Sequence, residues 1–135
     1  MPKALIRVAI VDDEPAVRTA LARLLVASSF EPKTYGSARE FIDSIGRDIP
    51  ECLIVDVHMP GFTGLDLQRY LNQINKKIPT IVITALDDAA TRERSTASGA
   101  SAFLTKPLDG PILIKAIKDA TMGSRSVPAN TGDDC

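Results

Sequence analysis

Short apolar runs alternate along the chain with longer segments in which apolar residues recur at helical spacing. Strands buried on both faces give continuous apolar runs, whereas helices that cover a sheet carry one apolar face. The alternation therefore predicts an α/β fold, built from repeated strand–helix units around a parallel sheet with helices on both faces. We count five units of this kind. The predicted strands are residues 5–11, 31–35, 51–55, 79–84 and 101–105.

Most of the helical segments carry start or stop signals. The first helix is expected to begin at Pro15, because the fixed φ of proline suits a first turn. Ser37 should cap the second helix, with Glu40 completing a capping box and Gly46 ending the helix. The other two amphipathic helices are expected over residues 64–74 and after Pro111.

The fourth helical segment, Asp88 to Ser98, differs from the others. Its only apolar side chains are alanines, and Arg92 and Arg94 are expected to form a solvated face. Because most helix stability in proteins comes from a packed apolar face, we predict that this helix is the most mobile element of the fold.

Length and composition indicate one domain. The chain has 135 residues, 44% of them hydrophobic, and we assign residues 1–122 to the domain and 123–135 to a flexible tail or the start of a linker. A net charge of -1 offers nothing to attract nucleic acid or an anionic membrane. The first apolar run is too short for a signal peptide or a membrane span, so a cytoplasmic protein is expected.

Polar side chains follow four of the predicted strands. Asp12 and Asp13 follow the first strand, Asp56 the third, Thr84 the fourth and Lys106 the fifth. Because the carboxyl ends of strands in open α/β sheets line the crevice where ligands bind, these side chains should converge. Crowded carboxylates repel one another unless they share a proton or bind a hard cation, which favours Mg²⁺, with Mn²⁺ next.

Asp56 is the best candidate for a nucleophile at this edge of the sheet, because a carboxylate can attack phosphorus to form an aspartyl phosphate. A cation and Lys106 would neutralise the phosphoryl oxygens, while Thr84 and loop amides would donate hydrogen bonds. Taken singly, each residue has an ordinary explanation, as a helix cap, a turn residue, a strand end or a solvated lysine. Their occurrence at four separate strand ends favours a phosphoryl-transfer site.

Four motifs carry a family resemblance: Val11–Glu14, Asp56–Gly61, Ile83–Ala85 and Leu104–Pro107. Together they resemble the receiver domain of bacterial two-component response regulators, over residues 5 to about 122. The resemblance implies a doubly wound (βα)5 fold with the flavodoxin-like strand order 2-1-3-4-5.

The resemblance also implies a role for each site residue. Asp56 would accept a phosphoryl group from a histidine kinase or a phosphotransfer protein. Thr84 and Lys106 would contact the phosphoryl oxygens, and Phe103 would be the switch aromatic that turns inward as the Thr84 hydroxyl moves toward the phosphate. The Mg²⁺ ligands would be Asp12, Asp13, Asp56 and the backbone carbonyl of His58.

Members of this family signal through the face formed by the fourth helix, the fifth strand and the fifth helix, and phosphorylation can pair two copies into a homodimer. The segment around Asp56 also resembles receivers that precede LuxR-type helix-turn-helix domains. Such an output domain is absent from this chain, so DNA would be bound only through a further domain.

Two other functions use the same residues. One is a Mg²⁺-dependent aspartyl-phosphate phosphohydrolase that acts on an external substrate, although His58 stands where a second aspartate would be expected in such enzymes. The other is an interaction domain with a vestigial site, which the intact set of polar residues argues against. We therefore expect a signalling domain that catalyses only its own phosphoryl transfer and dephosphorylation.

Overall fold

The computed structural model describes residues 5–47, 49–59, 63–85 and 89–125. Five parallel strands form a single sheet in the order β2-β1-β3-β4-β5, which confirms the predicted fold and strand order. The strands are β1 (Ile6–Val11), β2 (Phe30–Tyr35), β3 (Cys52–Asp56), β4 (Thr80–Thr84) and β5 (Ala102–Thr105). The helices are α1 (Pro15–Ala27), α2 (Ala38–Ser44), α3 (Gly64–Gln73), α4 (Ala89–Ala97) and α5 (Gly110–Arg125).

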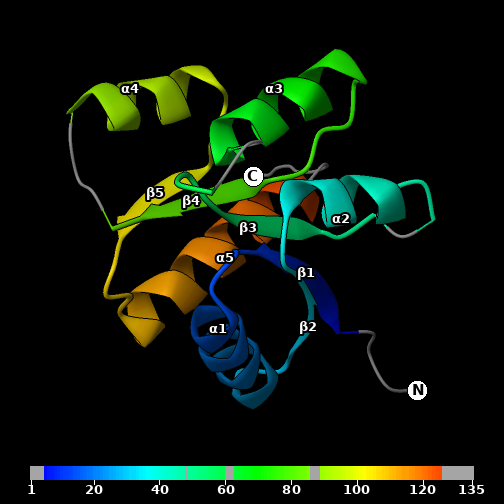
Figure 1. The fold of residues 1–135 in the computed structure, drawn as a ribbon. Coiled ribbons are helices and arrows are strands. Elements are labelled where there is room, and N and C mark those ends of the chain that lie inside the picture. Colours follow the sequence, from blue (N-terminus) through cyan, green and yellow to red (C-terminus); the bar gives the residue numbers. More distant parts are fainter. Residues whose placement is uncertain (1–4, 48, 60–62, 86–88, 126–135) are drawn as a thin grey trace, which may run out of the picture.

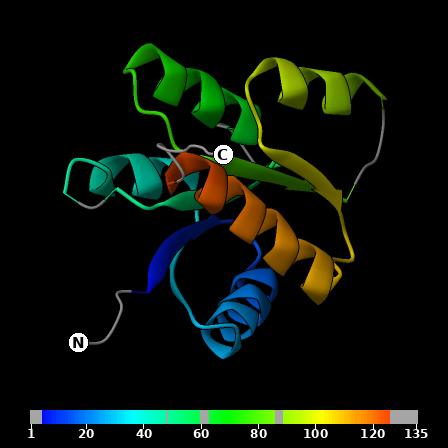
Figure 2. The same cartoon turned by 180° about the vertical axis from the view of Figure 1, so that it is seen from behind.

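Helices cover both faces of the sheet. Figure 1 shows α2, α3 and α4 on one side of the strands and α1 and α5 on the other, and Figure 2 shows the same layers from behind. Alternate residues of each central strand point to opposite layers, so Ile54 packs with α1 and α5 while Val55 packs with α2 and α3. Burial on both faces explains why the central strands are continuous apolar runs.

The strand register brings the carboxyl ends of the central strands to one edge of the sheet. Val11 of β1 pairs with Val55 of β3, so Asp12 and Asp56 follow at the same level. At the other side of β3, Asp56 itself pairs with Ile83, and Thr84 of β4 pairs with Thr105 of β5. The residues that the sequence places after these strands therefore leave the sheet side by side.

The start of α2 differs in part from the predicted capping box. Ser37 caps the helix, and its Oγ accepts a hydrogen bond from the Glu40 N–H at 3.2 Å, as predicted. The Glu40 carboxylate, however, accepts from the N–H of Gly36 at 2.9 Å instead of from Ser37. It therefore closes the turn that enters the helix.

A complete capping box lies at the start of α3, where none was predicted. Thr63 Oγ1 accepts from the Asp66 N–H at 3.2 Å, and Asp66 Oδ2 accepts from the Thr63 N–H at 3.0 Å. The Thr63 N–H, together with the side chain of Arg69, holds the pKa of Asp66 below its ordinary value. These contacts fix the first turn of α3 just beyond the Asp56 loop.

The helix α4 covers most of the segment predicted for it, and Asp88 lies outside the described residues. Its buried residues are Thr91 and Ser95, whereas Ala89 and Ala90 are exposed. Ser95 Oγ donates to the carbonyl of Thr91 at 2.9 Å, which satisfies the buried hydroxyl. The helix thus packs through hydroxyl-bearing residues, and the alanines Ala89 and Ala90 contribute little to its buried side.

Two amide side chains of α3 hold the end of α4. Gln68 Nε2 and Asn72 Nδ2 both donate to the carbonyl of Ser98, at 3.5 and 3.3 Å. Ser98 directly follows the last residue of α4, and the carbonyls at helix ends lack partners within the helix. Side chains of α3 therefore satisfy the Ser98 carbonyl, while the backbone N–H groups of Gly99 and Ala100 donate to the carbonyls of Thr96 and Ser95.

The last helix is longer than predicted. It begins at Gly110, where Asp109 Oδ1 accepts from the Ile112 N–H at 3.0 Å, and it continues past Met122 to Arg125. The predicted start of the tail at residue 123 therefore falls inside α5, and residues 126–135 lie outside the described residues. In the described part of the chain no helix combines the length and the apolar character needed to cross a bilayer.

Candidate phosphoryl-transfer site

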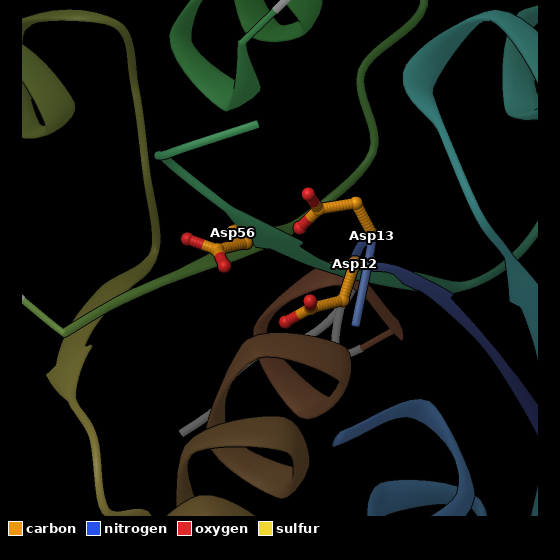
Figure 3. A group of neighbouring side chains, drawn as sticks. All are labelled: Asp12, Asp13 and Asp56. Atoms are coloured by element: carbon orange, nitrogen blue, oxygen red, sulfur yellow. The ribbon is translucent and has the colours of Figure 1, made fainter. Parts of the chain in front are cut away.

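Three carboxylates meet at the carboxyl edge of the sheet. Asp12 and Asp13 come from the end of β1 and Asp56 from the end of β3, and Figure 3 shows their side chains around one small space. One oxygen of each lies within 4.8 Å of the others. Asp12 and Asp56 are buried, whereas Asp13 is exposed. The predicted convergence of the strand ends is therefore confirmed for these side chains.

Lys106 supplies a positive charge to the same space. Its Nζ lies 2.9 Å from Asp56 Oδ2 and 3.2 Å from both Asp12 Oδ2 and Glu14 Oε1. Burial by itself would lower the pKa of Lys106, but the hydrogen bond and the charge of Asp56 outweigh it and raise the pKa above its ordinary value. The ammonium is therefore charged over the whole physiological pH range.

Asp56 is fixed on both of its carboxylate oxygens. Oδ2 accepts from Lys106, and Oδ1 accepts from the backbone N–H of His58 at 2.9 Å. The helix α3 also approaches closely, because a Cβ placed on Gly64 would lie only 2.5 Å from the carbonyl oxygen of Asp56. Only glycine fits there, and no pattern in the sequence indicates this close approach.

The backbone and side chain of Asp12 are held in a similar way. Its Oδ1 accepts from the Glu14 N–H at 2.9 Å, and its carbonyl accepts from Arg18 Nη1 at 2.6 Å. Burial raises the pKa of Asp12, and the nearby charge of Asp56 adds to this effect. The hydrogen bond from Glu14 and the charge of Lys106 act in the opposite direction and lower this pKa, but they do not cancel the effect of burial. Arg18 was not among the predicted site residues.

The cluster of three carboxylates, Asp12, Asp13 and Asp56, could bind a hard divalent cation. Oxygen ligands in close array are what Mg²⁺ prefers, and one oxygen from each of three carboxylates meets here. His58 lies on the loop after β3, but its side chain is exposed, and only its backbone N–H has a described contact with the site. Its carbonyl stays a predicted ligand.

Thr84 and Phe103 lie on β4 and β5, the two strands that follow β3 in the sheet. Thr84 is the last residue of β4, is fully buried, and its carbonyl accepts from the Lys106 N–H at 2.8 Å. Phe103, on β5, is half-buried. Arg92 is exposed, as expected for a solvated helix face, and its guanidinium also lies over the Phe103 ring, a contact that was not predicted.

Comparisons with known proteins identify relatives across most of the chain. A family model described as "Response regulator receiver domain" matches residues 8–118. Nodulation protein W of Bradyrhizobium diazoefficiens is 37% identical over 116 residues, which are 86% of this chain and 51% of that protein. Response regulator protein TmoT of Ectopseudomonas mendocina is 38% identical over 111 residues, 82% of this chain and 50% of that protein.

Solved structures agree with these sequence matches. The crystal structure of FixJ-N superposes with a TM-score of 0.82 at 34% identity, over 88% of this chain and 95% of that one. The chain spans about half the length of the two relatives named above, whereas it matches nearly all of the FixJ-N structure.

Proposed function

Because this chain belongs to the response regulator receiver domain family, we propose that it is the phosphorylation-controlled switch of a two-component phosphorelay, with Asp56 as the phosphoacceptor. Receiver domains are signalling domains of two-component systems. The phosphoryl donor would be a histidine kinase or a phosphotransfer protein. Catalysis would be limited to the domain's own phosphoryl transfer and dephosphorylation.

The contact between Lys106 and Asp56 supports this proposal most directly. An ammonium 2.9 Å from the carboxylate at a strand end is placed to neutralise the oxygens of an incoming phosphoryl group. Lys106 and Asp56 are separated by 50 positions in the sequence, so the fold must bring them together. A purely structural ion pair would not need two further carboxylates beside it.

The chain's own residues can supply most of what phosphoryl transfer needs. In the proposed step an Asp56 oxygen attacks phosphorus while the bond from phosphorus to the donor nitrogen breaks and the nitrogen keeps the electron pair. The His58 N–H on Oδ1 and Lys106 on Oδ2 hold the carboxylate in one orientation. Phosphoryl transfer depends mainly on positioning and charge stabilisation, so no separate general base is required.

Asp12, Asp13, Asp56 and the His58 carbonyl are the proposed ligands of Mg²⁺, with Mn²⁺ as a substitute. When bound, the cation would neutralise charge on the phosphoryl oxygens. Asp12 is buried and its pKa is raised mainly by that burial, so a cation beside it would favour its ionised form.

Thr84 and Phe103 are proposed to change position when Asp56 is phosphorylated. The Thr84 hydroxyl would contact a phosphoryl oxygen, and Phe103 would turn inward as Thr84 moves. Because α4 packs beside β5 and Arg92 lies over Phe103, this motion would change the face formed by α4, β5 and α5. That face would then bind a partner, or a second copy of the chain.

The domain organisation and the location are proposals as well. The match covers about half of each of the two named relatives, which supports a receiver of residues 1–122 followed by a linker and an output domain. Any DNA binding would belong to such an output domain. A histidine kinase uses ATP as its phosphoryl source, so we propose that phosphorylation of this domain takes place in the cytoplasm.

Intact-mass analysis tests the proposed acceptor. The wild type, Asp56→Asn and Asp43→Asn are incubated with acetyl phosphate and Mg²⁺. Asp43 is an exposed carboxylate on α2 and serves as the matched control. The wild type and Asp43→Asn should each gain one phosphoryl mass, and Asp56→Asn should gain none. No gain in the wild type, or an undiminished gain in Asp56→Asn, would reject the proposal.

The phosphohydrolase alternative predicts a different result, namely many turnovers of an external phosphomonoester per protein molecule. A groove of about 590 Å³ lies beside the site and is lined by Val57, His58 and residues of α3 and α4. In the described part of the chain Asp56 is not among the lining residues of this groove. We therefore favour the signalling role.

A further inference from the structure

Glu14 stands directly before α1, but its side chain serves the site instead of the helix. Its N–H donates to Asp12 Oδ1, and its carbonyl accepts from the N–H groups of Val17 and Arg18, each at 3.1 Å. The carboxylate makes no capping hydrogen bond. Its Oε1 instead accepts from Lys106 Nζ at 3.2 Å. A capping hydrogen bond therefore does not explain this carboxylate, whose charge near the start of α1 acts in addition to its contact with Lys106.

The contacts of the Lys106 ammonium suggest an explanation. An ammonium has three N–H donors, and carboxylates of Asp56, Asp12 and Glu14 lie 2.9, 3.2 and 3.2 Å from it. Asp12 and Asp56 also belong to the group that could hold a metal ion, and Glu14 does not. A bound metal cation would compete with Lys106 for the carboxylates of Asp12 and Asp56. The contact between Lys106 and Glu14 would not be affected by this competition.

We propose that Glu14 is a positioning residue for phosphoryl transfer, which holds the Lys106 ammonium so that it faces the oxygens of Asp56. This role presupposes the proposed function. A lysine side chain has many rotamers, and an anchor that fixes it beforehand reduces the entropy lost during transfer. Solvent screens the pair, because the Glu14 side chain is 62% exposed and that of Lys106 is 16% exposed. The effect should therefore be modest.

Phosphorylation kinetics can test this role. Glu14→Gln keeps the size of the side chain and removes its charge, and Glu31→Gln is the matched control, because Glu31 is an exposed glutamate on β2. With saturating Mg²⁺ and acetyl phosphate, Glu14→Gln should lower the rate about 2- to 5-fold, and Glu31→Gln should leave it unchanged. In a Lys106→Met background, Glu14→Gln should have no further effect.

Three kinetic results would overturn the proposal. The first is an unchanged rate in Glu14→Gln. The second is a faster rate, which is expected if Glu14 only repels the anionic donor. The third is an equal slowing with and without Lys106, which would mean that Glu14 acts through another group.

Thermal unfolding of the same variants, without donor, separates this inference from the proposed function. Glu14→Gln should lower the melting temperature by about 2–4 °C when Lys106 is present, and less in Lys106→Met. Any interaction of Glu14 with the start of α1 is common to both backgrounds and cancels. Equal shifts would reject the contact. A wild type that takes up no phosphoryl group would reject the proposed function, while unequal shifts would still establish that Glu14 holds Lys106.

Discussion

The guanidinium carbon of Arg92 lies 4.5 Å from the centre of the Phe103 ring, which joins α4 to β5. A cation over an aromatic face is attracted by the ring, and such a contact is worth about 0.5–1 kcal/mol at an exposed site. Phe103 is the proposed switch aromatic. The position of its ring and the position of α4 are therefore energetically coupled through one arginine.

Replacing Arg92 should weaken this coupling. Arg92→Ala should lower the free energy of unfolding by about 0.5–1 kcal/mol, measured by urea denaturation. Arg94→Ala, on the same helix, is the control and should have a smaller effect. In a Phe103→Leu background the cost of Arg92→Ala should fall, because the ring is gone. An equal cost in both backgrounds would mean that the contact with the ring contributes nothing.

Amide hydrogen exchange should identify α4 as the least stable helix. Its buried residues are Thr91 and Ser95, and side chains of this kind contribute little hydrophobic stabilisation. We expect its amides to exchange faster than those of α1, which buries Leu21 and Leu25. Exchange in α4 as slow as in α1 would contradict this prediction.

Gly64→Ala should damage the site through the backbone. The added Cβ would lie 2.5 Å from the carbonyl oxygen of Asp56, so the start of α3 or the loop after β3 must shift. We expect a loss of about 1–3 kcal/mol of stability, measured by urea denaturation, together with slower phosphorylation. Gly46→Ala is the control, since its Cβ would meet nothing within 4 Å. Equal effects of the two substitutions would refute this account.

Mg²⁺ should stabilise the protein in a pH-dependent way. Burial raises the pKa of Asp12, so the folded state holds its proton more tightly than the unfolded state, and ionisation at higher pH destabilises the fold. A cation offsets this cost. At pH 7, Mg²⁺ at about 100 times its Kd should add about 2.7 kcal/mol, with a smaller gain at pH 4, where a proton competes. Differential scanning calorimetry would measure both values, and Asp12→Asn should show little gain at either pH.

His58→Asn should shorten the lifetime of the phosphorylated protein. The bulk of His58 beside Asp56 is expected to slow the approach of water to the phosphoryl group. The loss of the phosphoryl mass after removal of the donor gives the rate, and His58→Leu, which keeps a large side chain, is the comparison. A His58→Asn protein that keeps its phosphoryl group as long as the parent does would contradict this idea.

The parts of the structure that the sequence predicted are those controlled by apolar periodicity. Continuous apolar runs such as Ile81–Ile83 mark the buried strands, and parallel strands place Asp12 and Asp56 at the same edge. The strand ends also place Lys106 at this edge, where its long side chain reaches Asp56 past the intervening β4. No such pattern identifies Gly64. Glycine is needed at this position because α3 lies so close to the Asp56 backbone that a side chain would not fit.

The parts that the sequence did not predict depend on polar groups that are buried or paired. Hydroxyl side chains such as Thr91 and Ser95 look like surface residues in a hydrophobicity pattern, yet they form the buried side of α4. In the sequence, Arg92 looks no different from Arg94. Only the three-dimensional position of the Phe103 ring, which lies under the Arg92 guanidinium, distinguishes the two arginines. Such contacts depend on three-dimensional placement.

The hydrogen bonds from Gln68 and Asn72 to the Ser98 carbonyl determine how α4 can move. They fix its C-terminal end to α3, while the contact between Arg92 and Phe103 lies nearer its N-terminal end. If the aromatic ring turns, α4 should therefore swing about Ser98 as a pivot, and its displacement should increase with distance from that residue. A binding partner that contacts the first turn of α4 would detect the largest change, and one that contacts the last turn would detect almost none.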